Sequence, residues 1–180
     1  IYMIIKNNEC KRLAIYFFFD KFGIVDRYVP YFLNDLNQNV DKTIIVVNGK
    51  LNNAGKETLS NYGEVIVREN KGFDVWAYKT ALEYVGWDNL EEYDEIVLLN
   101  STILGPIYPL KESFEKMSQC DLDFWGLTKY FKYDEDPFGC IPYGYIPDHI
   151  QSHFICCRKS LVKSDEFKKY WTDMPMIKNY

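Results

Sequence analysis

Short apolar runs alternate with amphipathic segments through the first hundred residues. Four runs are mostly apolar and each is closed by polar residues, which is typical of strands buried on both faces of a sheet. These predicted strands are residues 13–19, 43–47, 64–67 and 95–99. Between them, apolar residues recur every three or four positions, which predicts helices at residues 25–36, 54–62 and 73–85.

The second half is less regular. It predicts strands at residues 123–128 and 152–158, a helix at residues 110–117, and a last helix capped by Ser164. The segment 132–148 is rich in Pro, Gly and acidic residues and is expected to be a long loop with a functional role.

Alternating strands and helices predict an α/β domain with a mostly parallel central sheet flanked by helices. The carboxyl ends of parallel strands share one rim, where ligands of such sheets bind. Polar residues follow the predicted strands at that rim: Asp20, Asn48-Gly49, Asn70-Lys71-Gly72 and Asn100-Ser101-Thr102. We therefore expect Asn48, Asn70 and Asn100 to lie together.

The turn before the third helix has more polar chemistry than a helix start requires. Asn70, Lys71 and Gly72 precede the helix, and Asp74 lies in its first turn. Free N–H groups and the positive end of the helix dipole there are able to bind a phosphorylated ligand. The alternative is that Gly72 only makes the turn and Asp74 only favours the helix. The apolar stripe of this helix is predicted as Phe73, Trp76, Ala77, Thr80, Ala81, Tyr84 and Val85.

Composition narrows the class of protein. The 180 residues are 47% hydrophobic and 17% aromatic, which fits one folded domain of ordinary size. The longest apolar run, residues 13–19, is too short to span a membrane. A net charge of −5 argues against nucleic acid as a partner. Five scattered cysteines (Cys10, Cys120, Cys140, Cys156 and Cys157) favour a reducing compartment.

Several longer stretches of the chain have unusual combinations of residues: ENKGFDVWAY (69–78), LLNS (98–101), GP (105–106), DFWG (123–126), PYGYIP (142–147), HIQS (149–152) and FKKYW (167–171). In these stretches the chain resembles the rhamnan synthesis protein F family of glycosyltransferases. The resemblance as a whole covers about residues 12–175. The turn at 69–73 is also similar to the nucleotide-side turn of inverting GT-A glycosyltransferases.

The resemblance implies a single GT-A-like domain over residues 1–180, expected to be part of a longer chain with further domains. It implies an inverting hexosyltransferase whose donor is a nucleotide sugar, dTDP-L-rhamnose. The implied acceptor is a growing lipid-linked polysaccharide of the cell surface, such as cell wall or lipopolysaccharide. The expected location is the cytoplasm, peripherally at the inner face of the membrane.

The sequence departs from the GT-A pattern where a metal-binding Asp-x-Asp triplet usually closes the fourth strand. Asn100, Ser101 and Thr102 stand there instead, and an amide beside two hydroxyls is a weak set for Mn²⁺ or Mg²⁺. Either Asn100 binds a metal together with another acid, or Lys71, Lys129 and helix N-termini offset the diphosphate charge, or the domain is catalytically degenerate. The donor-binding residues are expected to be Asn48, Asn70, Lys71, Gly72, Asp74, Asn100, Ser101 and Thr102.

Inverting transfer needs a carboxylate that takes the proton of the acceptor hydroxyl. Asp148, at the mouth of a predicted strand, is the favoured catalytic base. The other candidates are Asp134, Glu135, Asp136, Asp165 and Glu166, of which the last two also suit a helix start. Trp125, Gln151 and His153 are the expected sugar or acceptor residues, with Tyr143 and Tyr145 as further stacking faces and core packing as the alternative for Trp125.

Two other classes stay open. A degenerate module would bind a nucleotide sugar or glycan and leave the chemistry to a partner domain. A flavodoxin-like domain would bind flavin and be yellow. There is no G-x-G-x-x-G and no G-K-[ST] stretch, which argues against dinucleotide-binding and P-loop sites.

Overall fold

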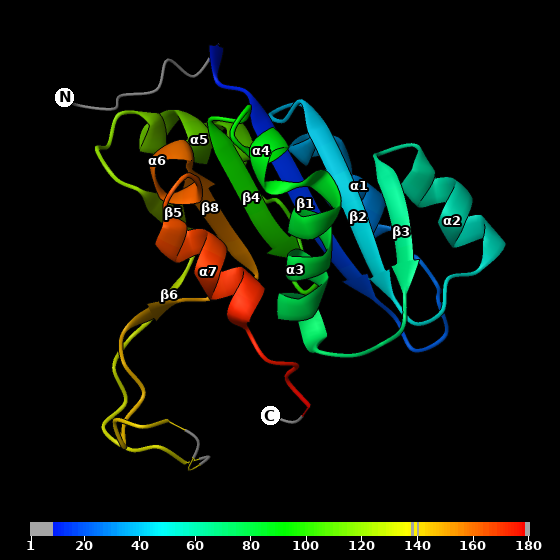
Figure 1. Ribbon diagram of the computed structural model, residues 1–180. Helices are drawn as coiled ribbons and strands as arrows, with labels where there is room; N and C mark the ends of the chain where they lie inside the picture. The colour runs from blue at the N-terminus through cyan, green and yellow to red at the C-terminus, as the bar shows by residue number, and fades with distance from the viewer. Residues whose placement is uncertain (1–8, 138, 140, 179–180) are drawn as a thin grey trace.

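The computed structural model describes residues 9–137, 139 and 141–178, which form a six-stranded sheet with helices on both faces (Figure 1). The strand order is β3-β2-β1-β4-β8-β5. Four strands are parallel: β1 (Arg12–Phe19), β2 (Lys42–Asn48), β3 (Glu64–Arg68) and β4 (Glu95–Asn100). β8 (Phe154–Arg158) runs antiparallel between β4 and β5 (Phe124–Gly126). The predicted mostly parallel α/β sheet is confirmed.

The helices divide between the two faces of the sheet (Figure 1). One face packs against α1 (Tyr28–Leu36), α5 (Leu110–Ser118) and Leu59 of α2 (Asn53–Ser60). The other packs against α3 (Phe73–Val85), α4 (Trp87–Leu90), α6 (Lys159–Val162) and α7 (Asp165–Asp173). Side chains of β1, β2 and β4 alternate between these two cores, so the central strands are apolar on both faces. Ser164 caps α7 as predicted, accepting a hydrogen bond from Phe167 N at 3.1 Å.

Several boundaries differ from the predictions, among them the start of β8 at Phe154 rather than at residue 152. α1 begins at Tyr28 rather than at residue 25, and β5 keeps only three of the six predicted residues. The predicted loop at 132–148 belongs to an arm, here residues 129–150, whose base is a two-stranded ladder of β6 (Lys129–Tyr130) and β7 (His149–Ile150). A further bridge joins Tyr133 to Ile146. The arm extends beyond the carboxyl ends of the parallel strands, at the lower left of Figure 1.

The predicted stripe of α3 is confirmed at Ala77 and Ala81, but the rest of the buried face is rotated from the prediction. The residues that face the core are Ala77, Tyr78, Lys79, Ala81 and Leu82, whereas Tyr84 is 57% exposed and Trp76 is half-buried. Lys79 is buried because its ammonium group donates to Thr172 O and Met174 O at the end of α7. The spacing of apolar residues did not predict this face, because Tyr78 and Lys79 carry polar groups that form hydrogen bonds inside the protein.

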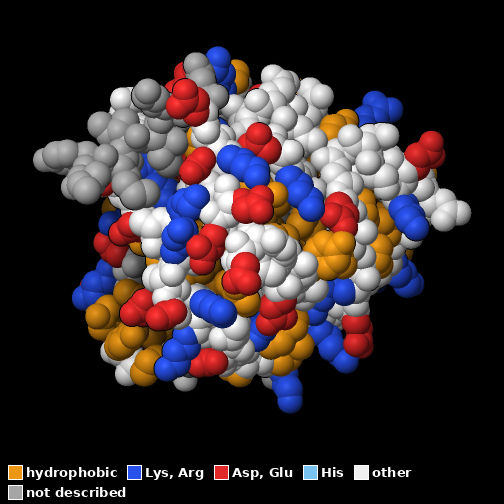
Figure 2. Space-filling model, turned by 45° about the horizontal axis from the view of Figure 1, so that its top comes forward, with side chains coloured by type: hydrophobic (Ala, Val, Ile, Leu, Met, Phe, Trp, Pro, Cys, Tyr) orange, Lys and Arg blue, Asp and Glu red, His pale blue; other side chains and the backbone are white. Residues whose placement is uncertain are grey.

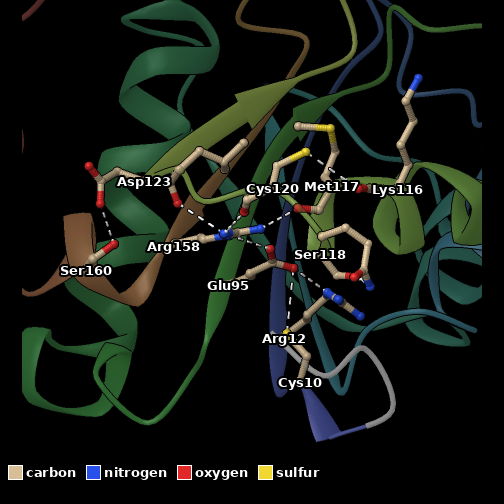
Figure 3. Close-up of polar contacts among 12 residues, drawn as sticks. Cys10, Arg12, Glu95, Lys116, Met117, Ser118, Cys120, Asp123, Arg158 and Ser160 are labelled. Carbon is tan, nitrogen blue, oxygen red and sulfur yellow. Dashed lines mark hydrogen bonds and ion pairs between the residues drawn. The ribbon is translucent and has the colours of Figure 1, made fainter. Parts of the chain in front are cut away.

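Three charged side chains are buried where β1 and β4 begin and β8 ends (Figure 3). Glu95 accepts from Arg12 Nε at 2.6 Å and from Arg158 Nε at 3.4 Å. The remaining Arg158 donors reach the carbonyls of Met117, Cys120 and Leu122, at 2.6, 2.7 and 3.2 Å. Arg158 therefore joins the sheet to the end of α5.

The cysteines behave mostly as small apolar residues. Cys156 and Cys157 are buried, Cys10 and Cys120 are half-buried, and all four are free thiols; Cys140 lies outside the described residues. Burial raises the pKa of Cys10 and of Cys157 to about 12, which keeps both thiols protonated at neutral pH.

Candidate functional site

Two buried asparagines flank the central strand at the carboxyl-end rim. Asn48 closes β2 opposite Phe19 and is fully buried, and Asn100 closes β4 opposite Phe17 and is 7% exposed. Both continue the strand positions that face α3, since side chains two apart share one face of a sheet. Asn70 lies at the same rim in the turn after β3. The predicted meeting of the three asparagines is confirmed.

Asn48 holds the turn before α3. Its amide nitrogen lies 3.4 Å from both Asn70 Oδ1 and Phe73 O, and its oxygen accepts from Arg68 at 2.7 Å. Arg68 also donates to Lys71 O at 3.0 Å. The side-chain hydrogen-bonding groups of Asn48 are therefore occupied within the protein, where they position the turn.

The turn itself requires an unusual backbone. Gly72 has φ +71° and Phe73 has φ +55°, so two successive residues lie in the left-handed region. A Cβ on Gly72 would lie 2.5 Å from Trp76 Cβ and 2.9 Å from Met176 Sδ, so a larger residue would not fit. Asn70 and Lys71 are exposed, and the Lys71 ammonium group lies 2.8 Å from Glu69.

Asp74 joins three parts of the chain. One carboxylate oxygen accepts from Asn100 Nδ2 at 3.0 Å and from Ser152 Oγ at 2.8 Å. Tyr78, one turn along α3, donates from its hydroxyl to Ser152 O at 3.0 Å. Burial and the neighbouring Asp74 charge raise the pKa of Tyr78, so its hydroxyl stays a donor. Asp74 thus fixes the end of β4 and the entry to β8 against α3.

A third polar group lies at the base of the arm. Thr128 Oγ1 donates to Gln151 Oε1 at 2.9 Å and lies 2.7 Å from His153 Nε2. Burial lowers the pKa of His153, which therefore stays neutral around pH 7. Gln151 and His153 flank Ser152, so this group adjoins the one around Asp74.

The acidic candidates for the base do not gather at one point. Asp148 lies in the arm, where its carboxylate meets the Lys129 ammonium group and Lys132 N, each at 2.5 Å. The hydrogen bond from Lys129 is the main cause that lowers the pKa of Asp148. Asp134 pairs with Lys132 at 2.8 Å, and Asp136 accepts from Ile141 N at 2.7 Å. Asp165 and Glu166 occupy the first turn of α7.

Trp125 is removed from the expected sugar-binding residues. It is 3% exposed and packs edge-on against Phe114 and tilted against Phe154, with ring centroids 5.4 and 5.6 Å apart. Core packing is therefore its role. Tyr143, by contrast, is 66% exposed in the arm beside Tyr145.

The residues at the end of β4 do not fit a metal site. Asn100 Oδ1 already accepts from Thr102 N at 3.1 Å and from Thr102 Oγ1 at 2.5 Å. Asp74 supplies the one carboxylate that contacts Asn100, and within the described part of the chain no three His, Cys, Asp or Glu side chains group as metal ligands. A hard cation prefers several charged oxygens, which this set does not offer.

A cavity of about 480 Å³ borders the turn. It is lined by residues 70–73 on one side and by Met176, Ile177 and Lys178 of the C-terminal segment on the other. Lys71 and Lys178 both line this space and are exposed, and the Lys71 ammonium group is paired with Glu69. Figure 2 brings the opposite rim forward, and on the face that it shows basic and acidic side chains are interspersed.

Sequence reasoning did not select four residues that organise the site: Arg68, Tyr78, Thr128 and Ser152. Arg68 and Tyr78 lie within the predicted strand–turn–helix unit and were treated as its flanks. Ser152 was assigned to the following strand. Their partners are 20 to 78 residues away, so local sequence pattern carried no signal for them.

Solved structures share this fold. The chain resembles a 4-diphosphocytidyl-2C-methyl-D-erythritol synthase with TM-score 0.53 and 15% identity, over 89% of this chain and 83% of that one. A CMP:2-keto-3-deoxy-manno-octonic acid synthetase complexed with CTP gives TM-score 0.51 and 9% identity, over 92% and 78%. A UDP complex of glucosyl-3-phosphoglycerate synthase from Mycobacterium tuberculosis gives 0.48 and 12%, over 86% and 59%. The first two similarities confirm the GT-A-like fold.

One family model matches the sequence over residues 43–180, and its description is rhamnan synthesis protein F. The match includes β2, the turn before α3, β4, the arm and α7. Among curated proteins, none matches the chain.

Proposed function

The chain belongs to the rhamnan synthesis protein F family of glycosyltransferases, and from this membership we propose that its donor is dTDP-L-rhamnose. The proposed acceptor is a growing lipid-linked polysaccharide of the cell surface, which the domain meets at the inner face of the membrane. None of the helices in the described residues is long and apolar enough to cross a bilayer.

The observation that supports this proposal is the turn at residues 70–74. Buried Asn48 contacts Asn70 of this turn, and Asp74 at its end accepts a hydrogen bond from Asn100. Asn70 and Lys71 remain exposed beside the 480 Å³ cavity. A nucleoside diphosphate needs hydrogen-bonding groups for the nucleoside and positive charge for the phosphates. We assign the nucleoside to Asn70 and the phosphates to Lys71, both of which line the cavity beside the turn.

The residues at the end of β4 have a positioning role in this proposal. Asn100 holds Asp74, Thr102 holds Asn100, and Ser101 is tied to β1 through its N–H and Phe17 O at 3.0 Å. Together they place the β4 loop beside the donor rather than supplying metal ligands. Mn²⁺ or Mg²⁺, when bound to the donor itself, would neutralise its diphosphate.

Asp148 is the proposed base. Its lowered pKa keeps it ionised at neutral pH, which is the form that accepts a proton. Lys129 and the Lys132 N–H already contact this carboxylate, so an acceptor hydroxyl competes with both for it. Asp74 is a carboxylate in the candidate donor turn, and separate Asp148→Asn and Asp74→Asn variants test which of the two serves as the base.

The test is binding followed by transfer. Calorimetry with dTDP, UDP and GDP should give the tightest binding for dTDP, and Asn70→Ala should weaken it. Labelled dTDP-L-rhamnose should then label a rhamnose-containing acceptor, and Asp148→Asn should abolish labelling without changing dTDP affinity.

The alternative is a sugar-nucleotide or glycan-binding module without catalysis. The absence of a carboxylate at Asn100, Ser101 and Thr102 favours it. Normal dTDP binding without transfer to any acceptor would support this alternative. Folded wild-type protein that binds no nucleotide would reject the donor assignment.

A further inference from the structure

An apolar pocket of about 430 Å³ lies between α3, α7 and the sheet. Its floor is formed by Leu98 of β4 and by Ile155 and Cys157 of β8, and Trp171 of α7 forms a wall. The exposed lining residues, which mark its mouth, are Phe124, Ser152 and Tyr170. The volume lies in the range of pockets that hold small molecules, about 300–1,000 Å³.

The lining determines what this pocket is able to bind. None of its lining residues is charged, and two of its three hydroxyls are engaged: Ser152 donates to Asp74 and Tyr78 donates to Ser152 O, while the third belongs to exposed Tyr170. Cys157 is a protonated, buried thiol and adds no charge. The buried Trp171 Nε1 has no hydrogen-bond partner and could pair with one acceptor atom of a ligand. Further polar groups would lose their water here without new hydrogen bonds, so the lining selects a ligand that is mostly hydrocarbon.

The pocket and the candidate donor site are neighbours, because residues that line a third cavity also line each of them. This third cavity, of about 640 Å³, shares Val75 and Tyr170 with the pocket and follows α7 to Ile177. Ile177 also lines the 480 Å³ cavity beside Asn70 and Lys71. Ser152 stands at the mouth with its hydroxyl on Asp74, so an occupant would have its outer end next to the residues that hold the rim together.

We propose that this pocket binds the hydrocarbon chain, acyl or isoprenoid, that carries the sugar acceptor, and that the polar end of the acceptor leaves the pocket at Ser152. Only the identification of this ligand as the acceptor rests on the proposed function, because the apolar lining by itself indicates that a hydrocarbon binds here. Binding should strengthen by up to about fourfold for each methylene that enters the pocket, until the pocket is filled.

The direct test is displacement of a fluorescent apolar probe, N-phenyl-1-naphthylamine, from the wild-type chain. Dodecyl rhamnoside should displace it, octyl rhamnoside should do so more weakly, and free rhamnose should not. Ile155→Trp and Leu161→Trp fill the pocket at half-buried positions and should lower probe affinity at least tenfold. Leu104→Trp is the matched control, because Leu104 is 72% exposed outside the pocket lining.

Affinity for dTDP, measured on the same proteins, separates this inference from the proposed function. Ile155→Trp and Leu161→Trp should keep wild-type dTDP affinity, which also shows that they are folded. The proposal would be overturned if dodecyl rhamnoside displaced no probe from the wild-type protein. It would also be overturned if Ile155→Trp and Leu161→Trp bound the probe as tightly as wild type. Chain-length-dependent displacement in a protein that binds no dTDP would support the pocket and reject the donor site.

Discussion

Glu95→Gln should destabilise the protein strongly although it changes one atom of the side chain. Glu95 is 2% exposed and supplies the negative charge between Arg12, 3% exposed, and Arg158, which is fully buried (Figure 3). Gln can still accept one hydrogen bond, but it leaves two buried guanidinium groups without their carboxylate. Removing one partner of a buried ion pair lowers the free energy of unfolding by about 3–5 kcal/mol. Gln keeps the volume and one hydrogen bond of Glu95, so the loss for this variant should be near the lower end, about 3 kcal/mol.

That loss is large compared with the total stability of a domain, about 5–15 kcal/mol. For a domain of this size it corresponds to a fall in Tm of about 6–12 °C. Urea unfolding followed by circular dichroism gives the free energy of unfolding, and an unchanged m-value confirms that the same surface is exposed.

The matched control is Glu92→Gln. Glu92 pairs with Lys11 at 3.0 Å, but their side chains are 63% and 46% exposed, so water replaces the lost interaction. Glu92→Gln should unfold at the wild-type urea concentration. If Glu95→Gln unfolded there too, the view of Glu95 as the required counter-charge for two buried cations would be refuted.

Three further predictions concern the rim. Asp74→Ala should weaken dTDP binding by about 1–3 kcal/mol, because Asn100 and Ser152 lose their shared acceptor, and calorimetry on folded protein would show an unchanged affinity if the turn is only structural. The free energy of unfolding should fall as the pH drops below about 6.5, because burial lowers the pKa of His153 and the unfolded chain takes up the proton first. His153→Gln should reduce the difference in unfolding free energy that urea titrations give between pH 7.5 and 5.5. An equal difference in the two proteins would contradict the assignment. Binding of dTDP should persist in EDTA and weaken with added salt, since Lys71 rather than a metal ligand set faces the cavity; calorimetry with EDTA or Mn²⁺ at two salt concentrations tests this, and complete loss in EDTA would contradict it.

Much of the fold was predictable because the central strands are apolar on both faces. Residues 13–19, 43–47 and 95–99 appear in β1, β2 and β4 with shifts of at most one residue at either end. The polar residues that end β2 and β4, together with the turn after β3, also placed three asparagines on one rim. The features that were predicted correctly are those whose pattern is visible within a few neighbouring residues of the sequence.

The missed features depend on partners far along the chain. Arg12, Glu95 and Arg158 stood at predicted strand ends, where charged residues normally mark exposure, and only their mutual contact explains their burial. Tyr78 and Lys79 turned α3 away from its predicted stripe because Ser152, Thr172 and Met174 accept their hydrogen bonds. The site roles of Asp148, Gln151 and His153 stay predictions.

The antiparallel course of β8 has a consequence for how this protein can change over evolution. Gly126 of β5 lies opposite Ile155 of β8, so the chain leaves and re-enters the sheet on adjacent strands, about 5 Å apart. The arm between them is topologically a long hairpin connection, and the entropy of closing such a connection grows only slowly with its length. An arm of another length or sequence could therefore be exchanged at this place while the parallel strands and the turn before α3 stay unchanged. Relatives could differ in this one segment and still share the rest of the fold.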